Sequence, residues 1–337
     1  MMNYRKFFQL VAIISFVVLL AQSGAQAATW KLSHMRTEGS EVDIDTKWFA
    51  AEAKKATNGR VNIDIYPSSV LGDYSVVQER ISIGDIEMML ACINSTVDRM
   101  AMLPVFPFIT KDWKEAKIAY GRGGVIYRQM EKLFDRQNIH MLTVWPAYFG
   151  GIILRKDAKG LKDPTVKKNL KLRTPFDVAY SLVLESQGFM ATPIALSDTF
   201  SAMQTGIVDG AIGAGAEGYY SNFRDLAKVY LPINDHFECW FFIVNKDIWN
   251  GLSKEDRDKL TKLANKLHDR RWAEAPKAQA MHEKNLESAG IKVVRYTDKE
   301  MNKIQEQVKK NVWPALYKEN HIVSEKIVKE VLDSLKK

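Results

Sequence analysis

The feature that most constrains the fold is an alternation of strand-like and helix-like segments, which begins anew after Gly150-Gly151. Short apolar runs of strand length alternate with longer amphipathic stretches. This alternation predicts an α/β architecture with a largely parallel sheet. Because the pattern restarts near the middle of the chain, we expect two lobes.

The predicted elements of the first half are short and end at turn residues. Asn58-Gly59 closes a helix, Pro67 follows a strand, and Gly84 closes a second helix. A pair of helices is expected between residues 113 and 137, divided at 121–124. The predicted strands are 29–34, 61–66, 88–93 and 140–145, and the other predicted helices are 41–57 and 74–83.

The second half repeats the alternation and then becomes helical. Ser253, with Asp256 three residues later, begins a predicted helix that extends to residue 288. This helix is long enough to run along both lobes, with a kink at Pro276. Thr297 and Glu300 begin a further helix. The predicted strands are 152–155, 171–174, 191–194, 209–212 and 237–245, and the other predicted helices are 178–186 and 197–205.

The N-terminus has the three parts of a secretory signal peptide. Arg5 and Lys6 precede an apolar stretch, and the small residues 23–27 follow it. The apolar core is shorter than the roughly 20 residues of a membrane-spanning helix. We therefore expect cleavage after Ala27 and a periplasmic location, and membrane anchoring is the weaker alternative.

Composition and charge exclude one class of partner. The net charge of +8 belongs to the 337-residue chain, and the basic residues are interspersed with acidic ones. No basic block with interleaved aromatic residues occurs, so nucleic-acid binding is not expected. Cys92 and Cys239 each lie in an apolar run, and we expect two buried free thiols, although an exported protein could also pair them.

Motifs of catalysis are weak or absent. The six histidines form no H-E-x-x-H, and neither C-x-x-C nor G-x-S-x-G occurs. The run 213–218 fits G-x-G-x-x-G, the pattern of a dinucleotide-binding turn. However, this run follows a short strand late in the chain. We expect no cofactor, no metal site and no enzymatic activity, and interpret the run as a glycine-rich turn beside a cleft.

Several segments together resemble one family. Leu170–Pro175 contains Lys171, Arg173 and Pro175, and is followed by Gly188, Pro193 and the run 195–210, which ends in Gln204-Thr205-Gly206-Ile207-Val208-Asp209-Gly210. Further matching segments are 66–72, 103–108 and 245–253. In this order the segments are similar to the dicarboxylate-binding type of solute-binding proteins from tripartite ATP-independent periplasmic (TRAP) transporters.

The resemblance implies a fold, a domain division and a partner. It implies a two-lobed periplasmic-binding-protein fold with a long C-terminal helix that spans both lobes, and a cleft that closes on its ligand. We expect a first lobe at 28–151 with about 240–275, and a second lobe at 152–239 with about 276–337. The protein would act as a monomer that delivers a small organic acid to the permease subunits in the membrane.

The resemblance also implies that Arg173 binds the ligand's carboxylate. An arginine is always charged, and its planar fork matches a carboxylate in two parallel hydrogen bonds. The alternative, a surface salt bridge, is the ordinary state of an arginine.

Two departures from the family pattern bear on the ligand. A second arginine that many members carry after the Tyr148 turn is absent, and Arg155 is the nearest candidate. Residues 211–214 lack polar side chains and leave room. We therefore expect a monocarboxylate with a bulkier body, and an aromatic acid and an amino acid are both open candidates.

Further candidate residues surround this predicted site. Glu217 or Asp73 could meet an amino group, and Asn94 and His34 follow strands at the cleft. Gly213 would form the turn beside it. Candidate apolar walls, for which core packing is the alternative in each case, are Trp145, Tyr148, Phe149, Phe176, Tyr219 and Trp240.

Two other functions fit the same sequence. A periplasmic sensory subunit with this fold would bind the same ligand, and a neighbouring sensor kinase rather than a permease gene pair would indicate it. A periplasmic enzyme is the more distant alternative.

Overall fold

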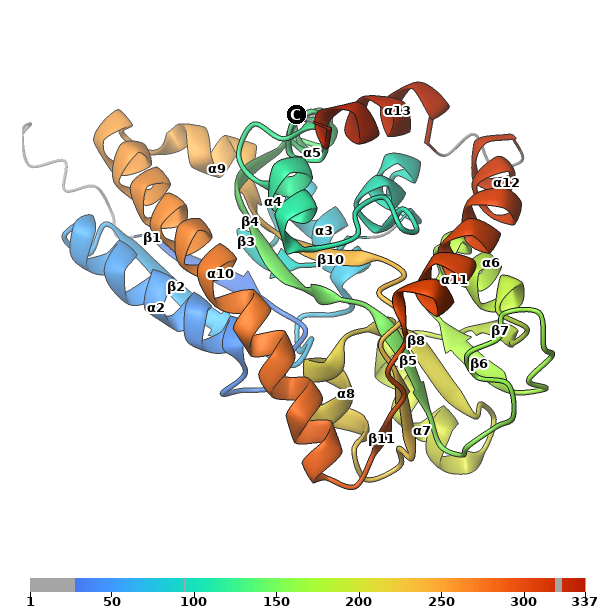
Figure 1. The fold of residues 1–337 in the computed structure, drawn as a ribbon. Coiled ribbons are helices and arrows are strands. Elements are labelled where there is room, and N and C mark those ends of the chain that lie inside the picture. Colours follow the sequence, from blue (N-terminus) through green and yellow to red (C-terminus); the bar gives the residue numbers. More distant parts are fainter. Residues whose placement is uncertain (1–27, 94, 319–322, 337) are drawn as a thin grey trace, which may run out of the picture.

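The computed structural model describes residues 28–93, 95–318 and 323–336. These residues form two β-sheets with helices packed around each (Figure 1). The predicted signal peptide, residues 1–27, lies outside the described residues.

The first sheet has the strand order β2-β1-β3-β10-β4. Its strands run parallel except β10, which is antiparallel to both β3 and β4. We call this sheet and its helices the first lobe. The strands are β1 (Ala28–Ser33), β2 (Val61–Tyr66), β3 (Met88–Ala91), β4 (Ile139–Phe149) and β10 (Phe237–Asn245). The helices are α2 (Glu41–Ala56), α3 (Tyr74–Ser82), the 3-10 helix η1 (Arg99–Val105), α4 (Trp113–Tyr120), α5 (Val125–Arg136) and α9 (Lys246–Gly251).

The second sheet has the strand order β11-β9-β5-β8-β6-β7. Here β5 is the strand that runs against its neighbours β8 and β9. We call this sheet and its helices the second lobe. The strands are β5 (Gly151–Leu154), β6 (Lys171–Thr174), β7 (Met190–Pro193), β8 (Gly210–Ala214), β9 (Val229–Leu231) and β11 (Lys292–Val293). The helices are α6 (Val178–Ser186), α7 (Leu196–Thr205), α8 (Ala216–Phe223) and α11 (Asp298–Asn311).

Two connections between strands, which lie side by side, join the lobes. The chain passes from β4 to β5 through Gly150, and returns from β9 to β10 through residues 232–236. The two connections are hydrogen-bonded to each other, since the Gly150 amide donates to the His236 carbonyl at 2.9 Å and the Asn234 amide donates to the Gly150 carbonyl at 3.0 Å. The crossing is therefore a small two-stranded unit of defined geometry.

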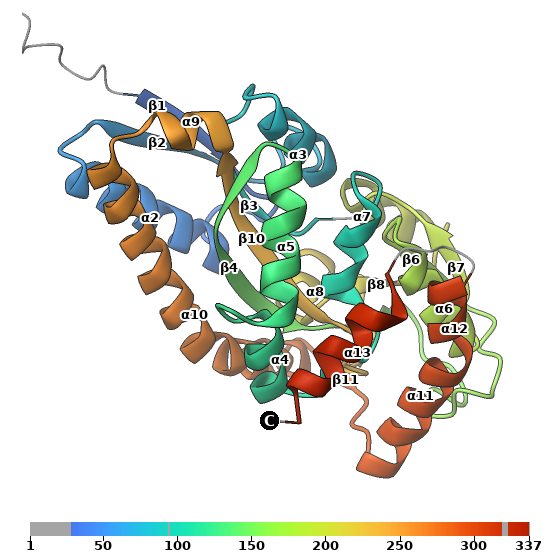
Figure 2. The same cartoon turned by 90° about the horizontal axis from the view of Figure 1, so that it is seen from above.

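The long helix α10 (Lys254–Ser288) packs on both lobes (Figures 1 and 2). It contacts β4 and α2 in the first lobe, and α8 and β11 in the second. The Ser253 hydroxyl caps its N-terminus by accepting from the Asp256 amide at 3.1 Å. Pro276 lies inside this helix, which continues past it to Ser288.

The C-terminal helices lead from the second lobe back to the first. α11 packs on α6, and α12 (Trp313–Lys318) continues from it. Trp313 donates its indole N–H to the Pro107 carbonyl at 2.9 Å. The last helix, α13 (Glu325–Ser334), lies against α4 and α5 (Figure 2).

The α/β architecture predicted from the sequence is confirmed. β6, α6 and β10 have the predicted limits, and α10 begins one residue after the predicted start. Among the predicted elements, the limits of β4 differ most: it is predicted at 140–145 but extends to Phe149, because it pairs with β10 along its whole length. The elements α8, β9 and β11 are not among the predicted ones. In the part of the chain that the structure describes, no helix has both the length and the apolar character needed to cross a bilayer.

Candidate ligand-binding site

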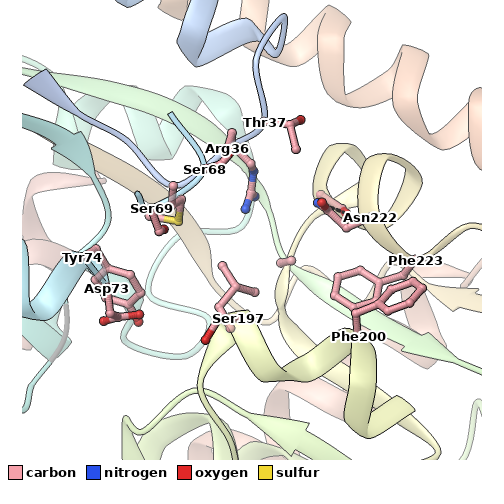
Figure 3. A pocket seen from close by; sticks show the side chains of 14 residues that line it. Arg36, Thr37, Ser68, Ser69, Asp73, Tyr74, Ser197, Phe200, Asn222 and Phe223 are labelled. Atoms are coloured by element: carbon pink, nitrogen blue, oxygen red, sulfur yellow. Dashed lines mark hydrogen bonds between the residues drawn. The ribbon is translucent and has the colours of Figure 1, made fainter. Parts of the chain in front are cut away.

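A cavity of about 470 Å³ lies between the lobes. Met35, Arg36 and Thr37 reach it from the carboxyl end of β1, and α7 and α8 supply its opposite side (Figure 3). Ligands of open α/β sheets bind outside the carboxyl ends of the strands, and this cavity has that position. We call it the main cavity. Its remaining lining residues are Ser68, Ser69, Asp73, Tyr74, Leu196, Ser197, Phe200, Ala214, Gly218, Asn222 and Phe223.

A second, much smaller space of about 30 Å³ continues from the main cavity. We call it the inner cavity. It shares Met35, Arg36, Tyr74 and Leu196 with the main cavity, and Arg173 lines it. Its other lining residues are Cys92, Ile93, Val105, Tyr148, Pro175, Asp177, Tyr180, Gly213 and Glu238. Because the two cavities share four lining residues, they adjoin each other, and we call them together the hollow.

Arg173 is a buried cation without an acidic partner. Its side chain comes from β6 and the residue is 3% exposed. Nε donates to the Ile194 carbonyl at 2.8 Å, and Nη1 donates to the Ile212 carbonyl at 3.2 Å. Among the described residues no carboxylate forms an ion pair with it, and burial lowers the pKa of Arg173. A charge taken out of water without a counter-ion is costly, so the site is prepared for an anion.

Arg36 is a second buried cation in the hollow, and sequence reasoning missed it. Its Nε lies 2.9 Å from Oε2 of Glu217 on α8, so that this ion pair joins the two lobes. Its guanidinium also lies over the Trp240 ring at 5.0 Å from the ring centroid. Burial, the largest single influence, would lower the pKa of Arg36, but the charge and hydrogen bond of Glu217 together with the neighbouring Tyr148 and Cys92 raise it. Arg36 is therefore neutralised by the protein, whereas Arg173 is not.

Two buried carboxyl groups stand at the inner end of the hollow. Asp177 accepts a hydrogen bond from the Ser95 amide of the first lobe at 2.8 Å, and burial raises the pKa of Asp177. Glu238 accepts from the Trp240 indole at 3.0 Å, and burial raises the pKa of Glu238 to about 7. These groups offer hydrogen-bond acceptors to a ligand rather than positive charge.

The predicted glycine-rich turn, residues 213–218, covers the end of β8, the connecting Gly215 and the first residues of α8. Its glycines make room for side chains of the site. A β-carbon on Gly213 would overlap Pro175, and one on Gly215 would overlap the Tyr148 ring. A β-carbon on Gly218 would lie 2.8 Å from Nη2 of Arg36. Contacts within the protein therefore explain why glycine stands at these three positions. Gly213 also lines the inner cavity.

The aromatic residues predicted as walls have different positions. Tyr148 lines the inner cavity. The Trp240 ring lies under the Arg36 guanidinium and stacks on the Trp145 ring, with 5.0 Å between the ring centroids. Phe149 packs in an aromatic core with Phe237, and the Tyr219 hydroxyl bonds the Gly151 and Ala211 carbonyls. Phe176 is 53% exposed and lines neither cavity. The aromatic rings that do line the main cavity are Tyr74, Phe200 and Phe223.

The remaining candidate residues also separate into two groups. Asp73 lines the main cavity while its carboxylate caps α3 through the Ser75 amide. His34 is buried beside Asp43, with 3.3 Å between Nε2 and Oδ1, and burial lowers the pKa of His34. Arg155 follows β5 next to Gly206, and lines neither cavity. Asn94 lies outside the described residues.

Both cysteines are free thiols. Cys239 is buried in β10, and Cys92 is only partly buried, at the inner cavity. Burial raises the pKa of both thiols well above the ordinary value.

Two α/β lobes, joined by crossing strands and holding a charged hollow between them, define the class of extracytoplasmic solute-binding receptors. Residues 32–320 match the family model described as "Bacterial extracellular solute-binding protein, family 7", and the chain belongs to this family. It is thus a solute receptor of the TRAP transporter type, which works with membrane permease components, and is not an enzyme.

Similar proteins support this assignment. The sialic acid-binding periplasmic protein SiaP of Vibrio cholerae is 24% identical over 302 residues, which cover 85% of this chain and 89% of SiaP. DctP7 of Bordetella pertussis, an extracytoplasmic solute receptor that binds pyroglutamic acid, superimposes with a TM-score of 0.80 at 20% identity, covering 92% of this chain and 100% of DctP7. The sugar acid-binding protein DctPAm of Advenella mimigardefordensis, in complex with galactonate, superimposes with a TM-score of 0.83 at 18% identity. The match covers 92% of this chain and 98% of DctPAm.

Proposed function

We propose that this receptor binds an organic acid through a single carboxylate, which pairs with Arg173. The observation that carries the proposal is that Arg173 is buried in the hollow with no acidic partner among the described residues. Two of its N–H groups are held by backbone carbonyls. Such bonds fix the plane of the guanidinium and leave other N–H groups for a carboxylate.

The charges of the hollow favour an acid with one carboxylate. Among the described lining residues, Arg36 and Arg173 are the only basic side chains, and Glu217 already neutralises Arg36. Asp73, Asp177 and Glu238 add acidic groups. A second carboxylate on the ligand would meet no free cation, and any of these acidic groups that is ionised would repel it.

The rest of the ligand would occupy the main cavity. Hydroxyl and amide groups of Thr37, Ser68, Ser69, Ser197 and Asn222 line it, together with the rings of Phe200 and Phe223. These groups suit a body that carries hydroxyl or ammonium groups and one apolar face. The related receptors that bind pyroglutamic acid and galactonate take acids with one carboxylate and a polar body. We infer a ligand of that general class.

The route to the periplasm and the assembly state complete the proposal. We propose export by the N-terminal signal, with cleavage after Ala27. Because one chain supplies both sides of the hollow, a single copy suffices for binding, and we propose a monomer that delivers its ligand to the permease.

A thermal-shift screen tests the proposal. The protein is first freed of co-purified ligand by unfolding and refolding, and then heated with keto acids, sugar acids, aromatic acids, amino acids and dicarboxylates. A ligand present at about 1,000 times its Kd stabilises the folded state by about 4 kcal/mol, which raises the melting temperature by several degrees. We expect this shift from a monocarboxylate. A shift from dicarboxylates alone would contradict the proposal.

A further inference from the structure

We propose that Glu217 restricts the hollow to acids with one carboxylate by occupying Arg36, and that removing its charge would let the receptor accept a second carboxylate. This inference rests on the proposed function, because it assumes that Arg173 holds the first carboxylate. It assigns to Glu217 a role in ligand selection, in place of the contact with a ligand amino group expected from the sequence.

The ion pair between Arg36 and Glu217 is supported by the surrounding structure. The side chains are 5% and 15% exposed, with 2.9 Å between Nε and Oε2. Nη2 of Arg36 lies 3.4 Å from the Tyr148 hydroxyl. The guanidinium lies between the Trp240 ring and the first turn of α8, where Gly218 leaves space for it. The pair is thus held on several sides.

The position of Arg36 makes it the natural partner for a second carboxylate. It lines both cavities, whereas Arg173 lines the inner one. Because Arg36 lines both cavities, a ligand bound to Arg173 and extending into the main cavity would pass Arg36. Figure 3 shows Arg36 at the main cavity. A second carboxylate there could reach the remaining N–H groups of Arg36 only beside the like charge of Glu217, unless it displaced Glu217 and left that largely buried carboxylate without its cation. Removing one member of a buried charge pair carries a large penalty.

The same geometry permits an opposite role, which the experiment separates. If Glu217 only holds the place of a ligand carboxylate and swings away on binding, wild-type protein would bind diacids through Arg36. If Glu217 excludes diacids, wild-type protein would bind them weakly, and the neutral variant E217Q would bind them better.

The test uses pairs of acids that differ in one terminal group. Gluconate and glucarate form one pair, and glutamine and glutamate form another. The dissociation constants of both members of each pair are measured by calorimetry for wild-type protein and E217Q. For each pair, the Kd of the diacid is divided by the Kd of its partner with one carboxylate. We expect this ratio to be about tenfold lower, or more, in E217Q than in wild-type protein for at least one pair. The double variant R36Q/E217Q should lose this gain.

A matched variant controls for the loss of a partly buried carboxylate. Glu283 on α10 is 12% exposed and pairs with Arg295, but lines neither cavity. E283Q should leave the preference between the acids unchanged. Melting curves establish that all variants are folded.

Three outcomes would overturn the inference. These are an unchanged ratio in E217Q for all pairs, absence of diacid binding by folded E217Q, and tight diacid binding by wild-type protein that R36Q abolishes. The first two leave the proposed function intact, and the third would also contradict binding through a single carboxylate. Acid binding that survives the loss of Arg173 would contradict the proposed function alone.

Discussion

The imidazole of His236 lies so close to the Cα of Gly150 that a β-carbon on Gly150 would overlap the ring. The two residues stand on the two connections between the lobes, and the Gly150 amide donates to the His236 carbonyl at 2.9 Å. Packing of a side chain against a bare backbone therefore fixes the place where the lobes join.

We predict that Gly150→Ala lowers the free energy of unfolding by about 1–3 kcal/mol, because overpacking displaces the imidazole or the strand connection. Urea denaturation of the ligand-free protein measures this. Gly251→Ala is the control, since a β-carbon at Gly251 would meet no atom within 4 Å. Equal stabilities of the two variants would contradict this view of the crossing.

The carboxyl of Glu238 should make stability depend on pH. Burial raises the pKa of Glu238 from 4.5 to about 7, and His236, whose Nε2 lies 3.6 Å from this carboxyl, also has a raised pKa. For His236, burial is the largest single influence and lowers the pKa, but the charge and hydrogen bond of Asp235 together with the charge of Glu238 raise it overall. Both groups bind protons more tightly in the folded state. The stabilising contribution of Glu238 is therefore complete below pH 4.5 and is lost as the pH rises through about 7, whereas that of His236 is complete below its ordinary pKa of 6.5 and is lost at higher pH.

The variant Glu238→Gln isolates this contribution, since an amide oxygen can still accept from the Trp240 indole. We expect the stability of E238Q relative to wild-type protein to rise by roughly 1–3 kcal/mol between pH 5 and pH 8. Urea denaturation at four pH values measures the difference. A difference that stays constant, or that changes in the other direction, would contradict a raised pKa of Glu238 in the folded state.

Arg271 should anchor the lobe-spanning helix. Its Nη1 lies 3.0 Å from the Glu41 carboxylate on α2, and its guanidinium lies over the Trp145 ring at 3.9 Å. Arg271→Ala should cost about 3 kcal/mol, because it leaves a partly buried carboxylate with less compensation and removes the ring contact. Arg122→Ala removes an exposed pair with Asp269 of the same helix, and should cost less than about 1 kcal/mol. Denaturant unfolding of both variants tests the contrast, which fails if their costs are similar.

Local signals explain why much of the fold could be predicted. Ser253 and Thr297 cap their helices through their own side chains, as their spacing to Asp256 and Glu300 predicts. Such information is contained in four consecutive residues. The continuation of β4 to Phe149 could not be predicted in this way, because it depends on pairing with β10, almost a hundred residues later.

The same distinction applies to the site. Arg173 was identified because it stands in a recognisable motif, and the structure places it in the hollow. Arg36 stands in no such motif, and its partner Glu217 is 181 positions away. The one signal that could have indicated Arg36 is its position just after β1, at the carboxyl end of a strand where ligands bind in α/β sheets. Phe149 and Tyr219 were candidates for the wall, but sequence alone does not tell which face of an apolar strand or helix is turned to a cavity.

The most direct test of the central claim compares wild-type protein with Arg173→Gln. Both are titrated by calorimetry with the strongest monocarboxylate from the screen and with its primary amide. We predict that wild-type protein binds the acid and not the amide, and that Arg173→Gln binds the acid at least about 100-fold more weakly. Arg173→Gln should remain folded, because it removes a buried cation that has no counter-ion in the ligand-free protein. Undiminished binding of the acid by folded Arg173→Gln would contradict the account.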